Sequence, residues 1–151
     1  MTVSAPVRAP ERPASVIVRD DGFNRDDWTG KATPLTDGLA GNSGAVDVTP
    51  ADDVAGLADH LDRITMIRVG FPSFGDGRGF TLARRLRQMG YTGRLRAQGH
   101  VLADQYAMAR RAGFDEVEID AALAARQPEA QWLARADWRA HDYQTRLRKA
   151  V

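Results

Sequence analysis

Apolar residues recur along the chain with two different periods, and these periods predict short strands separated by helices. Runs of β-branched or alternating apolar residues favour strands, and they occur at residues 15–19, 45–48, 64–71, 94–98 and 116–119. Apolar residues at helical spacing favour helices, and they occur at residues 49–62, 80–89, 101–112, 120–127 and 128–147. We expect Leu82, Leu86 and Leu102 to face a sheet and residues 20–43 to form a loop.

The predicted helices begin and end at residues that suit helix ends. Thr49 and Pro50 fit the cap and the first position of a helix, whereas Gly90 and Gly113 are placed to end the helices before them. Pro128 also fits a first helical position, so we place a break between two helices just before it.

The alternation of strands and helices predicts a single α/β domain at residues 15–151, preceded by a flexible, proline-rich tail at residues 1–14. We expect a mainly parallel sheet of about four strands with right-handed βα connections, and residues 15–19 as a further strand candidate. Such sheets bind ligands at the carboxyl ends of their strands. Three segments are expected there: residues 70–79, residues 98–101 and the chain from Asp120 onward.

The composition narrows the chemistry that the chain can perform. Of its 151 residues, 43% are hydrophobic and 27% charged, as in a globular protein, and none is cysteine, which excludes disulfides, thiolate zinc sites and iron–sulfur clusters. The three histidines lack metal-ligand spacing and no serine lies in a nucleophile elbow, so we assign no metal ligand and no catalytic residue.

No apolar run approaches the roughly 20 residues of a membrane helix, and residues 1–14 lack a secretory apolar stretch. We therefore expect a cytoplasmic protein without a membrane partner.

Charge is unevenly distributed, although the net charge is only +1. Residues 1–60 carry five basic and ten acidic side chains, whereas residues 61–151 carry sixteen and ten. No acidic residue lies between Asp76 and Asp104, where six arginines occur: Arg78, Arg84, Arg85, Arg87, Arg94 and Arg96. This block favours an anionic partner, either a small oxyanion or an acidic protein surface, and a solvated helix face is the alternative. Nucleic acid is disfavoured, because the net charge is near zero and few aromatic residues accompany these arginines.

The glycine-rich segment at residues 70–80 is the first candidate site. Glycines between a strand and a helix permit a tight turn and leave backbone amides free for an anion. The predicted binding residues are Asp76, Gly77, Arg78 and Gly79, with the guanidinium of Arg78 completing an oxyanion site. The glycine spacing matches neither a dinucleotide-binding loop nor a Walker loop. The structural alternative is a tight turn held by an Asp76–Arg78 ion pair.

A second candidate cluster comprises Arg96, His100, Asp104 and Gln105. His100 follows a predicted strand, and Asp104 lies one helical turn later, where its carboxylate could orient the imidazole. A capping or packing histidine is the alternative. Arg96 lies on a strand expected at the centre of the sheet, so it requires a carboxylate partner, for which Asp76 or Asp104 is the candidate.

The segment from Phe71 to Ile119 resembles the bacterial family called domain of unknown function 934. The most specific matches are the F-x-D-G-R-G motif at residues 74–79 and the pair Asp104-Gln105, and Tyr143-Gln144 is similar to the family's C-terminal signature. Further matches are Phe71, Pro72, Leu82, Ala83, Leu86, Arg87, Gly93, Leu95, Arg96, Ala97, Gly99, Gly113 and Phe114. A cysteine often precedes the Gly-Phe pair in the family, whereas this chain has Ala112 there.

Members of this family are usually encoded beside sirohaem sulfite reductase and are described as oxidoreductases of sulfite reduction. The resemblance therefore implies an accessory protein of assimilatory sulfite reduction, which binds an anion or its partner, sulfite reductase, through the Gly/Arg-rich strand ends. The alternative is a small α/β enzyme, either an oxidoreductase that borrows a flavin or nicotinamide or an isomerase. The sequence identifies no cofactor.

Overall fold

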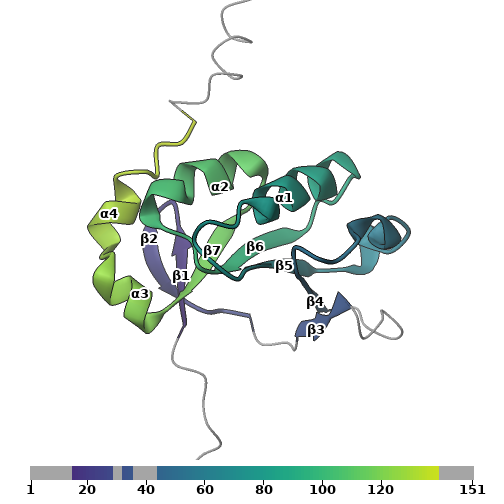
Figure 1. Ribbon diagram of the computed structural model, residues 1–151, viewed down its shortest axis with the longest axis horizontal. Helices are drawn as coiled ribbons and strands as arrows, with labels where there is room; N and C mark the ends of the chain where they lie inside the picture. Colours follow the sequence, from purple (N-terminus) through teal and green to yellow (C-terminus); the bar gives the residue numbers. More distant parts are fainter. Residues whose placement is uncertain (1–14, 29–31, 36–43, 140–151) are drawn as a thin grey trace, which may run out of the picture.

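The computed structural model describes residues 15–28, 32–35 and 44–139 (Figure 1). The predicted tail at residues 1–14, the Tyr143-Gln144 pair and the predicted helix end at residue 147 lie outside these described residues. Within them, the chain forms one mixed α/β unit around a seven-stranded sheet.

The strands follow a simple order across the sheet. From one edge to the other they are β2 (Gly22–Arg25), β1 (Ser15–Arg19), β7 (Glu116–Asp120), β6 (Arg94–Gly99), β5 (Met66–Phe71), β4 (Ala45–Val48) and β3 (Ala32–Pro34). Strands β3 to β7 run parallel, whereas β1 pairs antiparallel with both β7 and β2. The predicted α/β class and mainly parallel sheet are confirmed, but the prediction of about four strands was too low.

The missing strands lie partly in the segment that the sequence predicted as a loop. β2 and β3 are edge strands of four and three residues, and they contain Gly22, Asn24 and Pro34, which strands disfavour. Pairing with β1 and β4 holds them in the sheet, because a short edge strand depends on its neighbour and not on its own apolar pattern.

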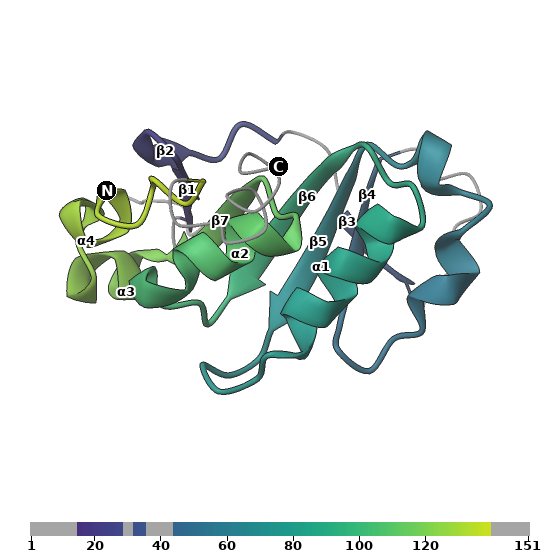
Figure 2. The ribbon, with the colours of Figure 1, turned by 90° about the horizontal axis from the view of Figure 1, so that it is seen from above.

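The helices cover one face of the sheet. α1 (Arg78–Gln88) contacts β5 and α2 (Tyr106–Ala112) contacts β7, whereas α3 (Ala121–Arg126) and α4 (Glu129–Leu133) lie beside β1 and β2 (Figures 1 and 2). Leu86 is fully buried in this core and Leu82 packs against it. Leu102 instead precedes the short 3-10 helix Ala103–Gln105 and is only half-buried, so its predicted place on the sheet was wrong.

Two predicted helices are shorter than the sequence pattern suggested. In place of the helix predicted at residues 49–62, the chain forms the 3-10 helices Val54–Leu57 and Leu61–Arg63, because the Asp53 carboxylate accepts from the Ala55 amide and starts a new turn there. The break before α4 is confirmed, with Pro128 at the cap position, but α4 ends at Leu133.

The second sheet face carries charged side chains. Parallel β-strands alternate their side chains between faces, and Arg94 and Arg96 on β6 therefore point to the same side as Glu116 and Glu118 on β7. β2 and β3 lie at opposite edges of the sheet, and Asp26 and Asp27, which follow β2, reach Arg96 and Arg94 of the central strand. The chain after β2 thus contacts the face that the helices leave uncovered.

Candidate functional site

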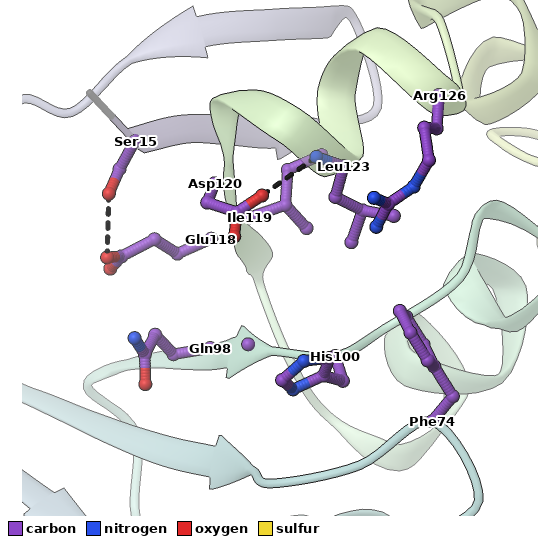
Figure 3. A pocket seen from close by; sticks show the side chains of 10 residues that line it. Ser15, Phe74, Gln98, His100, Glu118, Ile119, Asp120, Leu123 and Arg126 are labelled. Carbon is purple, nitrogen blue, oxygen red and sulfur yellow. Dashed lines mark hydrogen bonds between the residues drawn. The ribbon is translucent and has the colours of Figure 1, made fainter. Parts of the chain in front are cut away.

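A hollow of about 220 Å³ lies at the carboxyl ends of β6 and β7, at the edge where parallel sheets bind ligands (Figure 3). Its walls come from the end of β6, the loop after β5 and the first turns of α3. The lining residues are Ser15, Phe74, Gln98, Gly99, His100, Glu118, Ile119, Asp120, Leu123 and Arg126.

His100 is fixed at the mouth of this hollow by the backbone of the neighbouring strand. Its amide donates to the Phe71 carbonyl over 2.9 Å, and its Nδ1 lies 3.2 Å from the same oxygen. A carbonyl only accepts hydrogen bonds, so Nδ1 carries the hydrogen in this contact and Nε2 stays available to a ligand. The ring of Phe74 stands perpendicular to the imidazole, with 4.8 Å between the ring centres.

The turn that presents His100 requires glycine at position 99. Gly99 has a φ of +118°, and a Cβ there would lie 2.7 Å from the Phe71 carbonyl oxygen. Both the left-handed backbone and this close approach exclude other residues. The geometry that aims His100 at the hollow is therefore encoded by the residue before it.

Two further side chains in the hollow have no hydrogen-bond partner among the described residues. They are the Gln98 amide and the Arg126 guanidinium, which extends from the end of α3 toward the space beside Phe74 and His100 (Figure 3). The two carboxylates are already engaged: Asp120 accepts from the Leu123 amide over 2.7 Å, and Glu118 accepts from Arg68, Arg96 and Ser15. The donors left for a ligand are therefore the Arg126 guanidinium and the NH2 group of Gln98, a pair that suits an anion.

Two adjoining hollows extend the site along the strand ends. One of about 280 Å³ is lined by Thr49, Pro50, Gly70, Phe71, Pro72, Gln98, Gly99 and His100. Another of about 320 Å³ is lined by Pro34, Asp47, Val48, Thr49, Asp52, Arg68, Gly70 and Gln98. Gln98 belongs to all three hollows, which therefore meet at the end of β6.

Arg96 has the carboxylate partners that its buried position requires, but they are not the ones predicted. Its Nε donates to Glu116 over 2.6 Å, one terminal nitrogen to Glu118 over 2.9 Å and the other to Asp26 over 3.1 Å. Neither Asp76 nor Asp104 bonds to it, because the pairing of β6 with β7 places Glu116 and Glu118 beside it. Burial alone would lower the pKa of Arg96, yet these carboxylates raise it above its ordinary value.

This ion-pair network continues across the second face of the sheet. Arg68 binds Asp47 and Glu118, while Arg19 and Arg94 both bind Glu116 and Asp27. The sequence contains a signal for it, since Arg94-x-Arg96 and Glu116-x-Glu118 alternate with the period of a strand and carry opposite charges. The network holds neighbouring strands together, and its cations are already paired.

The glycine-rich loop places Asp76 and Arg78 against each other. The Asp76 carboxylate accepts from the Arg78 amide and from two guanidinium nitrogens, at 3.1, 3.0 and 2.7 Å. The hydrogen bonds from the Arg78 side chain lower the pKa of Asp76 to about 2. The Arg78 side chain nevertheless remains 65% exposed, so it can also face a partner.

The two predicted glycines of this loop have different surroundings. Gly77 precedes α1 and its carbonyl accepts from the Phe80 amide over 3.1 Å. Gly79 is buried, and a Cβ there would lie 2.4 Å from the Phe71 ring. Close packing of α1 against β5 therefore accounts for the glycine at position 79.

Neither Asp104 nor Gln105 forms a hydrogen bond with the imidazole of His100. The Asp104 side chain is 80% exposed and pairs with Arg135 over 3.0 Å. The Gln105 amide accepts from the Leu102 amide over 2.9 Å and donates to the Phe74 carbonyl over 3.4 Å. Gln105 thus supports the Phe74 loop beside the hollow, whereas Asp104 does not orient His100.

Of the eight predicted binding residues, only His100 lines the strand-end hollow. The sequence indicated the right segments there, at residues 98–101 and from Asp120 onward, but it did not single out Gln98 or Arg126. Arg126 gave no sequence signal, because its place beside His100 depends on how α3 packs against the end of β7.

The α1 arginines divide into two groups. Arg84 and Arg85 are exposed, as the helical pattern predicts. Arg87 is half-buried, and its guanidinium donates to the carbonyls of Tyr91, Gly93 and Gly113 as well as to Asp115. Arg87 therefore does not belong to a solvated helix face, the alternative considered for the arginine block.

The fold and this hollow define a mixed α/β protein with a polar pocket at the carboxyl ends of its parallel strands. The chain belongs to the family described as "Bacterial protein of unknown function (DUF934)", whose sequence pattern matches residues 45–151. Comparisons with curated proteins and with solved structures gave no match.

In the described part of the chain, no group of three His, Asp or Glu side chains is placed to hold a metal ion. Among the described helices, none has the length and apolar character to cross a bilayer.

Proposed function

We propose that this protein is an accessory protein of assimilatory sulfite reduction, which binds an oxyanion in its strand-end hollow and docks on sulfite reductase. The observation that carries the binding role is the pair of donors at this hollow, the Gln98 amide and the Arg126 guanidinium, which have no partner among the described residues. The sulfite-reduction context rests on the family resemblance.

The docking role is supported by the exposed arginines of α1 and of the loop before it. Arg84 and Arg85 form no ion pair with any described residue, and Arg78 is more than half exposed despite its pairing with Asp76. Unpaired surface cations favour association with an acidic protein face and make that association sensitive to salt.

Isothermal titration with sulfate and sulfite tests the binding role. The wild type should bind the oxyanion, and Arg126→Gln should weaken binding at least about fivefold, because it removes a charged donor. Arg25→Gln, at an exposed arginine on β2, serves as the matched control and should leave the affinity unchanged. Equal oxyanion affinities for all three proteins would contradict binding of the oxyanion in this hollow.

Capture of purified sulfite reductase on the immobilised protein tests the docking role. We expect binding that falls between 50 and 300 mM salt (on the order of the range in which screening acts) and that is weakened in the double variant Arg84→Ala/Arg85→Ala. Salt-independent binding, or none at low salt, would contradict the docking role and leave the oxyanion site as a separate question that the titration answers.

A further inference from the structure

Gly70 lies in β5 without any structural requirement for glycine. Gly79 and Gly99 are explained by close contacts with Phe71, and Gly99 and Gly113 by positive φ angles of +118° and +119°. Gly70 has no such angle, and the nearest atom to a Cβ there would be the Val48 carbonyl oxygen at 3.7 Å, an ordinary contact. A glycine inside a strand costs stability, so its presence here points to the space above it.

That space belongs to the strand-end site. Gly70 pairs with Gln98 in the β5–β6 register, and it borders both hollows that adjoin the one at His100. Apart from its two chain neighbours, no described residue other than Val48 would lie within 4 Å of its Cβ, so a side chain at this position would extend into the open volume. The absence of a side chain keeps this volume clear.

The volume beside Gly70 differs in character from the hollow at Arg126. Its walls include the rings of Pro50 and Pro72, whereas the other hollow presents the Arg126 guanidinium and the Gln98 amide. The two hollows share Gln98, Gly99 and His100, so they are adjacent with His100 at their boundary. A ligand that fills both must carry an acidic group at one end and an apolar group at the other.

From this arrangement we infer that the ligand of the strand-end site is an organic anion and not a bare inorganic oxyanion. Its acidic group, a sulfonate or carboxylate, accepts from the Arg126 guanidinium and the Gln98 amide, and its apolar part lies over Gly70 between Pro50 and Pro72. This inference rests on the proposed anion site and adds the apolar half of the ligand to it.

Benzenesulfonate, methanesulfonate and sulfate are suitable probes, since they share the oxyanion chemistry and differ in the apolar group. Titrations should show that the wild type binds benzenesulfonate about tenfold more tightly than methanesulfonate or sulfate, because only the ring buries apolar surface. Gly70→Val should abolish this preference and leave sulfate binding unchanged, since Gly70 does not line the hollow at Arg126. Gly56→Ala, an open position in the 3-10 helix Val54–Leu57, should preserve the preference.

Far-ultraviolet circular dichroism and a thermal melt verify that each variant folds. If Gly70→Val does not fold, Gly70→Ala replaces it. With alanine we expect a partial loss of the preference for benzenesulfonate. Equal binding of the three probes by the wild type, or an unchanged preference in the folded Gly70 variant, would overturn the inference, while sulfate binding that depends on Arg126 would still support the proposed function. Failure of all three probes to bind would overturn both.

Discussion

Arg96 and Glu116 form a buried ion pair across the two central parallel strands β6 and β7. The Arg96 Nε donates to a Glu116 oxygen over 2.6 Å, and the two side chains are 0% and 3% exposed. Around this pair, three further arginines and four further carboxylates connect neighbouring strands on the face opposite α1 and α2. The sheet is therefore held by an apolar core on one face and by ion pairs on the other.

Arg96→Met should destabilise the protein by about 3 kcal/mol, because it leaves Glu116 and Glu118 buried with fewer cationic partners. Urea titration of the free energy of unfolding measures the loss. Arg84→Met, at an exposed position on the helix α1, is the matched control and should change stability by less than about 0.5 kcal/mol. A loss below about 1 kcal/mol for Arg96→Met would mean that the network contributes little to the fold.

Leu86→Ala should cost about 2–5 kcal/mol in the same measurement, because the side chain is fully buried between α1 and the sheet and its removal leaves a cavity. Leu82→Ala should cost less, since Leu82 is only partly buried at the edge of that core. Equal losses at the two positions would contradict the orientation of α1.

Arg78→Ala should leave the melting temperature nearly unchanged, because the Arg78 side chain is exposed and its only ion pair with a described residue is with its near neighbour Asp76. The same variant should bind sulfite reductase more weakly and with less dependence on salt. Thermal melts and capture experiments on one preparation separate the two roles. A much lower melting temperature combined with normal binding by the folded fraction would assign Arg78 a structural role instead.

Stability should depend on pH through Asp20, which accepts hydrogen bonds from Tyr106, Arg110 and Trp138. Burial opposes ionisation, but these hydrogen bonds lower the pKa of Asp20 below its ordinary value of 3.8. Its contribution is therefore complete above about pH 4 and is lost as the pH falls through the lowered folded pKa.

Asp20→Asn removes this contribution, so unfolding free energies measured between pH 6 and 2 (roughly the range over which carboxylates protonate) should fall less steeply with acid than in the wild type. The exposed Asp59 provides the control: Asp59→Asn should follow the wild-type curve. If the unfolding free energies of the wild type and Asp20→Asn fall equally as the pH is lowered, these hydrogen bonds do not favour the ionised carboxylate.

The sequence alone determined the features that depend on neighbouring residues. The apolar spacing of residues 80–89 predicts α1, and Gly113, with its φ of +119°, ends α2 as predicted. The β-branched run at residues 15–19 predicts β1 at its observed bounds. These elements were predictable because side-chain periodicity and helix-end chemistry act within a few residues of the chain. The same local pattern gave the strand-end segments where ligands of parallel sheets bind.

The tertiary structure decided which distant residues meet. Arg96 lies 70 positions from Asp26 and 20 from Glu116 in the sequence, so its partners follow from strand order and register and not from local spacing. The edge strands β2 and β3 exist only through pairing, and His100 and Arg126 line one hollow only because α3 packs at the end of β7. A buried charged side chain pairs with the side chains that strand order and register place beside it, and the local sequence does not specify those neighbours.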